Sequence, residues 1–247
     1  FAAVAASFPV KHVPIHANHR YWFNRGNHFI AAAKNTGIIH ASGELLISYD
    51  DAEFLPPHLL QLTWDTYQSG VYLLALHKRW KTFQGEEYVS DHRWRDLKDC
   101  ARVCEPNWTY AGTSFSLADA LALNGFNERM DGYRSLEDCE FGIRLQKLGR
   151  QVVVHPQGYF HILDHPKFSY SFQPLIAVEN HGLLECAKHD PDPRANCRDL
   201  TPDQLRIVRE QTLKYRHFDP VEFPANFETW KSTPTFDLRQ EWIAARP

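Results

Sequence analysis

The alternation of apolar and polar positions predicts that strands and helices follow one another along the first two thirds of the chain. Apolar residues recur at helical spacing over residues 27–40, whereas the apolar runs that start at Glu44 and Val71 are typical of buried strands. In chain order, the pattern predicts a strand over 11–16, a helix over 27–40, a strand over 44–49, a helix from Pro57 to about Gly70, a strand over 71–77, a strand over 110–115, a helix over 117–123, a helix over 135–148 and a strand over 151–155. This order predicts an α/β layered fold.

Two of the predicted helices have boundaries that the sequence marks. Pro57 suits the first helical position, and Gly70 suits the position after the last one. In the helix from Pro57 we expect Leu59, Leu60 and Trp64 to face inward. In the helix over 135–148 the residues expected to face inward are Phe141, Leu145 and Leu148, with Gly149 following the last turn.

Two stretches lack this pattern. Residues 80–108 are polar, rich in Trp, Arg and Asp, and without a period, so we expect them to form a long excursion over one face of the sheet. Residues 189–200 resemble a linker or surface loop, and the capping box at Thr201–Gln204 starts a helix that continues to about Arg216. We therefore expect one domain over 1–175 and a helical and irregular C-terminal extension over 176–247.

Composition narrows the classes of function. The chain has 247 residues, 43% of them hydrophobic, and a net charge of −3, which argues against a nucleic-acid-binding surface. It has no apolar run of 18 residues, and its first residues lack Met and a basic leader, so we expect no membrane span and no signal peptide. These features favour the cytoplasm or the cytoplasmic face of a membrane. The five Cys fit no complete disulfide framework.

An acidic cluster follows the strand over 44–49. Asp50, Asp51 and Glu53 place three carboxylates within four residues, and carboxylates are the ligands that Mg²⁺ or Mn²⁺ takes together with phosphate oxygens. If the strand continues, Asp51 and Glu53 share a face as metal ligands, and Asp50 points to the opposite side, toward ribose or sugar hydroxyls. The alternative is a solvated acidic turn near the start of the next helix.

A second acidic site, Glu137-Asp138, lies at the start of the helix over 135–148. A carboxylate within hydrogen-bond reach of an acceptor hydroxyl can take its proton, so Asp138 or Glu137 is a candidate catalytic base. The alternative is structural, because first-turn carboxylates complement the helix dipole and Ser135 begins a capping-box-like sequence.

His161 is a candidate third metal ligand. It follows the last predicted strand, and neutral imidazole binds Mn²⁺ acceptably. His155 and His165 are weaker candidates, and an ordinary surface or core role remains the alternative for each of the 14 His.

Four stretches together resemble family-2 glycosyltransferases with the GT-A fold. They are residues 33–38 with 41–44, residues 46–53, residues 112–115 with 123–128, and residues 137–141 with Arg144, Leu145 and Gly149. Their order and separations agree with the family as well, over roughly residues 30–165. The resemblance implies a GT-A-like layered fold, with a mostly parallel central sheet flanked by helices.

The resemblance also implies an activity and residue roles. The activity is inverting transfer of a sugar from a nucleotide-diphosphate sugar to a hydroxyl of a carbohydrate or glycoconjugate acceptor, with a divalent cation (Mn²⁺ or Mg²⁺) as cofactor. Asp138 would be the base, and Glu137 would bind hydroxyls of the acceptor or donor. Asp51 and its neighbours would hold the metal and diphosphate, and His161 would make a further metal or phosphate contact. Lys34 and Asn35 would lie near the nucleotide.

The sequence departs from the family pattern in two places. Ala52 stands where the last Asp of the metal-binding motif usually lies, and no segment before residue 30 matches the nucleoside-binding strand, helix and strand with which relatives begin. We therefore expect an N-terminally incomplete fold, and it stays open whether this chain alone is active. The first alternative function is a non-catalytic GT-A-like protein that binds a carbohydrate or a partner, and the second is a metal-dependent hydrolase.

Overall fold

The computed structural model describes residues 11–13, 30–49, 53–80, 87–88, 102–104, 109, 112–131, 136–163, 174–214 and 235–246. In chain order the elements are α2 Ile30–His40, β1 Leu45–Ile47, β2 Glu53–Phe54, α3 His58–Gln68, β3 Tyr72–Trp80, β4 Glu87–Tyr88, β5 Arg102–Val103, β6 Ser114–Ser116, α4 Leu117–Ala122, the 3₁₀ helix η4 Glu128–Met130, α5 Glu137–Lys147, β7 Val152–Leu163, α6 Pro174–His189, α7 Pro202–Lys214 and α9 Leu238–Ala244. The α/β class predicted from the alternating pattern is confirmed. Residues 11–13 form no strand, and the rest of the strand predicted over 11–16 lies outside the described residues.

The sheet is built around β3 and β7, which run parallel from the pair Tyr72–Val152 to the pair Trp80–Leu163. β2 and β5 pair with β7 and β4 pairs with β3, all antiparallel. β1 pairs antiparallel with β6, and a bridge between Leu74 and Thr113 joins this pair to β3. Among the described pairs the longest is therefore parallel and the shorter ones are antiparallel, so the sheet is mixed rather than mostly parallel.

β7 is longer than the strand predicted over 151–155. The sequence His155-Pro156-Gln157-Gly158 reads as the end of a strand, because Pro cannot donate a ladder hydrogen bond. In the structure the pairing register with β3 shifts between Leu74 and Leu76, and β7 pairs again from Tyr159 onward. This irregularity accommodates Pro156 and Gly158, so β7 continues past them to His161.

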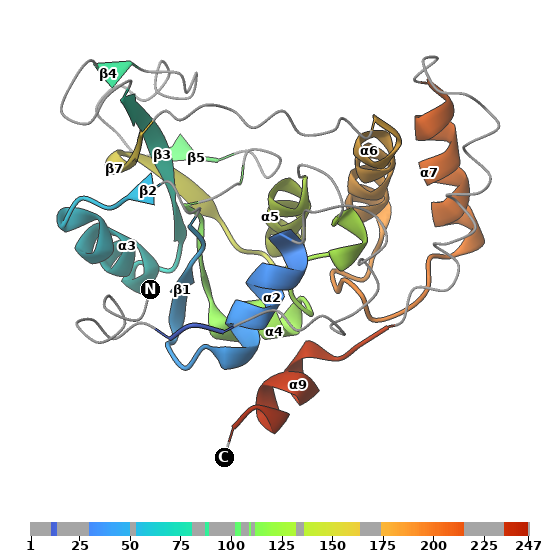
Figure 1. The fold of residues 1–247 in the computed structure, drawn as a ribbon, viewed down its shortest axis with the longest axis horizontal. Helices are drawn as coiled ribbons and strands as arrows, with labels where there is room; N and C mark the ends of the chain where they lie inside the picture. The colour runs from blue at the N-terminus through green and yellow to red at the C-terminus, as the bar shows by residue number, and fades with distance from the viewer. Residues whose placement is uncertain are drawn as a thin grey trace.

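Helix α3 covers one face of the sheet (Figure 1). Its Leu59 is fully buried in a cluster with Leu73, Ala75 and Phe160. The prediction that Leu60 and Trp64 also face inward is wrong, because these side chains are 57% and 41% exposed. The buried face of the helix is narrow and consists of Leu59 and Thr63. The neighbouring apolar positions therefore lie at the surface.

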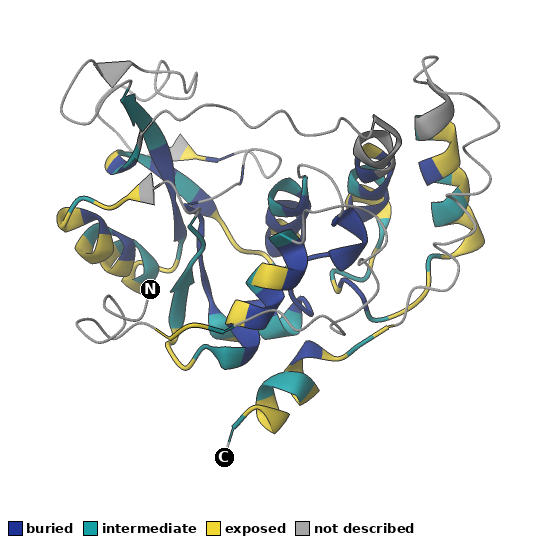
Figure 2. Ribbon diagram, in the orientation of Figure 1, coloured by how far each residue is buried: buried dark blue, intermediate teal, exposed yellow. Residues whose placement is uncertain are grey.

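Helices α2, α4 and α5 lie on the other face and enclose the main core (Figures 1 and 2). Phe126 and Phe141 stack with their ring centroids 4.2 Å apart, and Phe115 meets Phe141 edge-on at 4.9 Å. The predicted burial of Phe141 and Leu145 in α5 is confirmed, whereas Leu148 is only partly buried. This core fixes the position of α5 relative to the sheet.

The turn at Asn124-Gly125, which we call the 124–125 turn, joins α4 to the rest of the molecule. Both residues have positive φ angles, 58° and 73°. The Asn124 carboxamide accepts a hydrogen bond from the Leu238 backbone N–H at 2.6 Å, and it donates to the carbonyls of Ala195 and Phe236 at 2.7 and 2.9 Å. The turn therefore binds two segments that lie more than 70 residues further along the chain.

The C-terminal part contains α6, α7 and α9. The predicted capping box is confirmed, since the Thr201 and Gln204 side chains exchange hydrogen bonds with each other's backbone N–H. α9 was not predicted; its Trp242 indole donates to the Ala41 carbonyl at 3.1 Å, just beyond the end of α2. Arg246 also donates to this carbonyl, and its positive charge complements the C-terminal end of the α2 dipole.

α6 packs on α5 and η4, and α9 packs on α2. The division of the chain at residue 175 stays a prediction. Among the described residues, no helix is both long enough and apolar enough to cross a membrane.

Candidate functional site

The predicted residues Lys34, Glu137 and Asp138 lie together where α2 meets the first turn of α5. The Lys34 ammonium donates to Glu137 Oε1 at 3.1 Å and also to Asp138 Oδ1. The side chains are 12%, 4% and 15% exposed respectively, so the group is largely shielded from water. The structure thus brings together a predicted nucleotide contact and the two predicted catalytic carboxylates.

This ion pair determines the charge of Lys34. Burial lowers the pKa of the ammonium, but the negative charges of Asp138 and Glu137 raise it by more, so its pKa lies above the ordinary value. Lys34 therefore stays positively charged over the whole range in which enzymes work. A positive charge here also offsets the repulsion between two carboxylates on adjacent residues.

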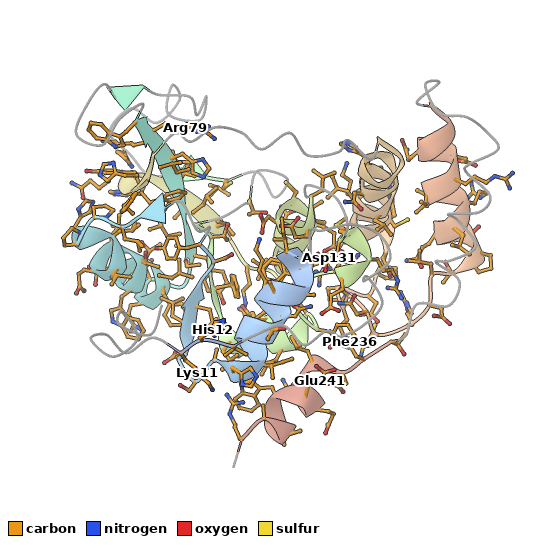
Figure 3. The ribbon with its side chains drawn as sticks, viewed as in Figure 1. Lys11, His12, Arg79, Asp131, Phe236 and Glu241 are labelled. Carbon is orange, nitrogen blue, oxygen red and sulfur yellow. The ribbon has the colours of Figure 1, made fainter. Side chains whose placement is uncertain are left out.

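α2 is held at its N-terminal end by a carboxylate from another part of the chain. Asp131 accepts hydrogen bonds from the backbone N–H groups of Ala31 and Ala32 at 2.7 and 2.9 Å, and Figure 3 shows it beside the start of this helix. The first turn of α2 contains no acidic residue, so Asp131 supplies acceptors for N–H groups that a helix start leaves without partners. Burial raises the pKa of Asp131 well above its ordinary value, although the two N–H groups act to lower it.

Asn35 ties α2 to the segment after the 124–125 turn. Its carboxamide accepts from the Phe126 N–H at 2.7 Å and donates to the Phe126 carbonyl at 2.9 Å and to Glu128 Oε1 at 2.8 Å. The residue is fully buried. These contacts give Asn35 a structural role that fixes the neighbouring Lys34. Its predicted contact with the nucleotide stays a prediction that they do not support.

The start of α5 is anchored to the chain just before β6. The Thr109 hydroxyl donates to the Asp138 backbone carbonyl at 2.6 Å, and the Cys139 thiol donates to the Thr109 carbonyl at 3.4 Å. The N-cap residue is Leu136, which makes no side-chain cap, and Ser135, with which the predicted capping-box-like sequence begins, lies outside the described residues. Instead, the Leu136 N–H donates to Glu137 Oε2 at 3.2 Å.

The same segment also holds the end of β1. The Ser48 N–H donates to the Thr113 carbonyl at 3.1 Å, and the Gly112 N–H donates to the Ser48 carbonyl at 2.6 Å. β1 therefore ends beside residues 112–113, and Thr109, three positions earlier, binds α5. The backbone that leads into the acidic cluster and the backbone of Asp138 thus reach the same short segment.

The acidic cluster itself lies largely outside the described residues. Asp50, Asp51 and Ala52 are not described, and only the backbone of Glu53 is, in β2. β2 lies next to β7, where Glu53 pairs with Ile162 and Phe54 pairs with His161. The chain thus crosses from the end of β1 to the strand that carries His161, but Phe54, not Glu53, is the residue opposite this histidine.

His161 is held by its neighbours on β3. The Trp80 indole N–H donates to His161 Nδ1 at 2.7 Å. Because an indole is only a donor, Nδ1 is the acceptor, and in a neutral ring the proton then lies on Nε2. Nearby, the Lys78 ammonium lies 3.8 Å from the centre of the Tyr159 ring, which meets the His161 ring edge-on.

This hydrogen bond bears on the predicted metal site. A metal ligand needs a nitrogen with a free lone pair, and in this arrangement Nδ1 is engaged and Nε2 carries a proton. With this hydrogen bond, His161 fits the role of an N–H donor better than that of a metal ligand. Within the described residues no group of three His, Cys, Asp or Glu could hold a metal ion. The metal at Asp51, Glu53 and His161 stays a prediction.

Sequence reasoning missed three features of this site's structure. The ion pair of Lys34 with Glu137-Asp138, the helix start held by Asp131, and the anchor at Thr109 were not predicted. The one available signal was physical, because two adjacent carboxylates at a buried helix start need a cation. The sequence holds no indication of which lysine supplies it.

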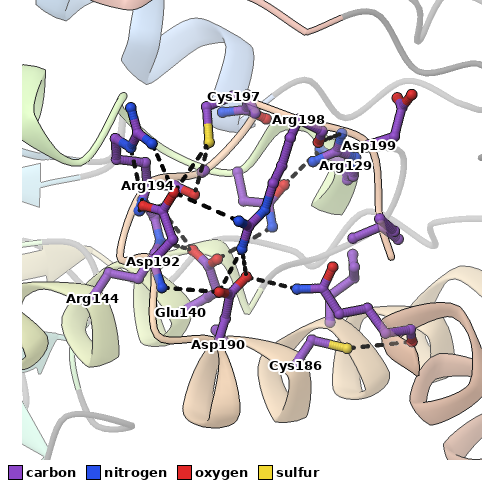
Figure 4. A pocket seen from close by; sticks show the side chains of 17 residues that line it. Arg129, Glu140, Arg144, Cys186, Asp190, Asp192, Arg194, Cys197, Arg198 and Asp199 are labelled. Atoms are coloured by element: carbon purple, nitrogen blue, oxygen red, sulfur yellow. Dashed lines mark hydrogen bonds and ion pairs between the residues drawn. The ribbon is translucent and has the colours of Figure 1, made fainter. Parts of the chain in front are cut away.

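A pocket elsewhere on the molecule is bounded by α5, α6 and residues 190–200 (Figure 4). Its volume is about 40 Å³, which is room for about three water molecules. Arg198 pairs with Asp190 at 2.6 Å and Arg194 pairs with Asp192 at 2.8 Å, so these charges neutralise one another. The pocket is lined by these ion pairs and is too small for a nucleotide sugar.

No protein-family model matches the sequence, and no curated protein matches it either. The structure is similar to a crystal structure of residues 1–349 of TarS from S. aureus in complex with UDP-GlcNAc, with a TM-score of 0.52 and 15% identity. The match covers 90% of this chain and 60% of that chain. A second crystal structure of S. aureus TarS matches with a TM-score of 0.46 and 14% identity, over 85% of this chain and 34% of that one.

The first of these likenesses concerns the fold alone, because its identity is low and this chain spans 60% of the matched chain. TarS is a family-2 glycosyltransferase. The expected fold is therefore confirmed: the chain has a mixed α/β fold similar to the GT-A-like fold of glycosyltransferases.

Proposed function

We propose that the chain belongs to an inverting glycosyltransferase that moves a sugar from a nucleotide-diphosphate sugar to a hydroxyl acceptor. The observation that carries the proposal is the position of Asp138. This carboxylate lies in the first turn of α5, and its backbone is anchored through Thr109 to the segment where β1 ends. The sequence resemblance implies that the donor diphosphate is held beyond the end of that strand, by Asp51 and its neighbours.

The proposed transfer is a single displacement. The acceptor hydroxyl loses its proton to the Asp138 carboxylate, and the acceptor oxygen forms a bond to the anomeric carbon. The bond between that carbon and the diphosphate oxygen breaks at the same time, and its electron pair leaves with the diphosphate. Attack from the side opposite the leaving group inverts the configuration. Glu137 binds hydroxyls of the acceptor or donor.

On the donor side, we place His161 as an N–H donor toward a phosphate oxygen, which would stabilise the charge that develops on the leaving diphosphate. Asp50 would accept a hydrogen bond from a ribose or sugar hydroxyl. A divalent cation at Asp51 and Glu53 would supply Lewis-acid neutralisation of the diphosphate when bound. UDP-GlcNAc is the first donor to test, because the TarS structure holds it.

The test is an Asp138→Asn substitution, measured as sugar transfer from radiolabelled UDP-GlcNAc and as donor binding by calorimetry. We expect transfer to fall about 10²–10⁴-fold, because this is the usual contribution of a general base. Donor affinity stays unchanged, because the base contacts the acceptor. Asp203→Asn is the matched control, since the Asp203 side chain is 88% exposed and far along the chain in α7.

Three outcomes separate the candidates. Wild-type rates in Asp138→Asn would refute the assignment of the base. Donor binding by the wild-type protein without any transfer would support the non-catalytic alternative. Release of free sugar without an acceptor would support a hydrolase.

A further inference from the structure

We infer that Lys34 is a positioning residue, which holds the Glu137 and Asp138 carboxylates in place for the acceptor rather than contacting the nucleotide. The inference rests on the proposed function, because it gives Lys34 a role in orienting the proposed base. It departs from the role that the sequence resemblance implies. The observations behind it concern contacts, burial and the support of α2.

Two contacts already hold the lysine on the carboxylates. Its ammonium has three N–H donors, and it bonds to one oxygen of each carboxylate. It also lies 5.0 Å from the centre of the Phe126 ring, on the side toward the core. Both bonds are buried and charge-assisted, which is the strong kind in proteins, so two of the three N–H donors are committed to the carboxylates.

The burial of Glu137 makes its ion pair with Lys34 important for stability. The Glu137 side chain is 4% exposed, and a charged carboxylate at this depth without a partner would be strongly destabilising. Its other oxygen accepts only the single N–H of Leu136 among the bonds described here. The Lys34 charge therefore offsets the negative charges of two adjacent carboxylates at the start of α5.

The position of Lys34 is itself fixed from both sides. Asp131 binds the first N–H groups of α2, and the next residue, Asn35, is locked to Phe126 and Glu128. On the α5 side, Thr109 binds the Asp138 carbonyl. Two anchored helices thus face each other across the ion pair, which leaves the Asp138 carboxylate little freedom to turn. Such fixed geometry is what a general base requires.

The test compares Lys34→Met and Lys34→Arg with the wild-type protein. For Lys34→Met we expect kcat to fall on the order of 10²-fold, the usual penalty for a misplaced catalytic group, while the Kd for UDP-GlcNAc changes by less than about twofold. The loss is larger at about pH 5 than at about pH 9, because an unpaired carboxylate binds a proton more readily. The kcat of Lys34→Arg should be at least about tenfold higher than that of Lys34→Met, because arginine keeps the positive charge.

Two further variants guard against a simple loss of folding. Glu137→Gln is compared with the double variant Lys34→Met/Glu137→Gln, because neither leaves a charged Glu137 without its partner. The double variant should still lose at least about tenfold in kcat relative to Glu137→Gln, if Lys34 orients Asp138. Lys188→Met is the matched control, because Lys188 pairs with Glu185 at the surface and its side chain is 46% exposed.

The results that overturn the inference are distinct from those that overturn the proposed function. A Kd for UDP-GlcNAc that weakens in Lys34→Met by the same factor as kcat/KM would make Lys34 a donor contact. An unchanged pH profile, with Lys34→Arg no better than Lys34→Met, would reduce its role to stability. A wild-type protein without transfer would instead refute the proposed function itself.

Discussion

Replacement of Gly125 by Ala tests how closely α2, the 124–125 turn and α9 are packed. Gly125 has a φ of 73°, and an added Cβ would lie 2.2 Å from Asn35 Oδ1 and 2.8 Å from Leu238 Cδ2. Both distances are below contact, so the two side chains must move. Gly149 offers a matched control: its φ is 75°, and nothing lies within 4 Å of the corresponding Cβ.

The magnitude follows from two separable contributions. An L-residue in the left-handed region costs about 1–2 kcal/mol at either site, part of which is offset by the lower entropy of the unfolded chain. At Gly125 alone, displacement of Asn35 also disturbs its buried hydrogen bonds to Phe126 and Glu128, and each polar group left unpaired costs about 1–3 kcal/mol. We therefore expect Gly125→Ala to lower the free energy of unfolding by about 3–5 kcal/mol and Gly149→Ala by about 1 kcal/mol.

Urea unfolding followed by tryptophan fluorescence measures both values, because the chain has seven Trp. The two variants should share the m-value of the wild-type protein and differ in their midpoints. Equal losses in Gly125→Ala and Gly149→Ala would show that the close approach at Asn35 is not a real constraint. The reasoning about α2 and Lys34 would then lose its support.

Two further predictions concern other ion pairs. Arg144→Met should lower the free energy of unfolding by about 3–5 kcal/mol in urea titrations, because Arg144 lies 2.6 Å from Glu140 and both side chains are at most 4% exposed. The control is Arg206→Met, which breaks a pair that is more than half exposed and should cost less than about 1 kcal/mol. Equal losses in the two variants would contradict the expected effect of burial. The Arg194 hydrogen bonds lower the pKa of Asp192 from 3.8 to about 2, so this carboxylate stabilises the fold above pH 3.8 and loses that effect as the pH falls toward 2. The difference in urea midpoint between the wild-type protein and Asp192→Asn should therefore be constant near neutral pH and vanish near pH 2, and a difference that grows on acidification would reverse the assignment.

Local periodicity was enough to predict the elements that bury a broad face. α5 presents Phe141 and Leu145 to the core, and the capping box at Thr201 and Gln204 forms as its residue types require. In these cases the information lies within one or two turns of helix, so the sequence pattern contains it.

The errors have a common physical cause. Leu60 and Trp64 are apolar but exposed, because the width of the face that α3 buries depends on how the helix meets the sheet. α9 was missed because Leu238 is its one fully buried residue, which is too few for a helical period to emerge. Both properties are set by packing partners far along the chain.

The candidate site was predicted residue by residue but not as an arrangement. The resemblance pointed to Asp138 as well as to Lys34, and the structure brings these two together across 104 positions. No local pattern contains this pairing. The roles of Asp50, Asp51 and Glu53 stay predictions, because their side chains lie outside the described residues.

The way in which α9 closes on α2 has a consequence for biosynthesis. The Trp242 indole binds a carbonyl 201 positions earlier in the chain, and Leu238 binds the 124–125 turn across 114 positions. At translation rates of about 5–20 residues per second, α2 would leave the ribosome about 10–40 s before its partner helix is synthesised. During that interval the C-terminal end of α2 lacks the contacts that Trp242 and Arg246 make with the Ala41 carbonyl, so the last turn of α2 should stay less protected until residues near 240 emerge.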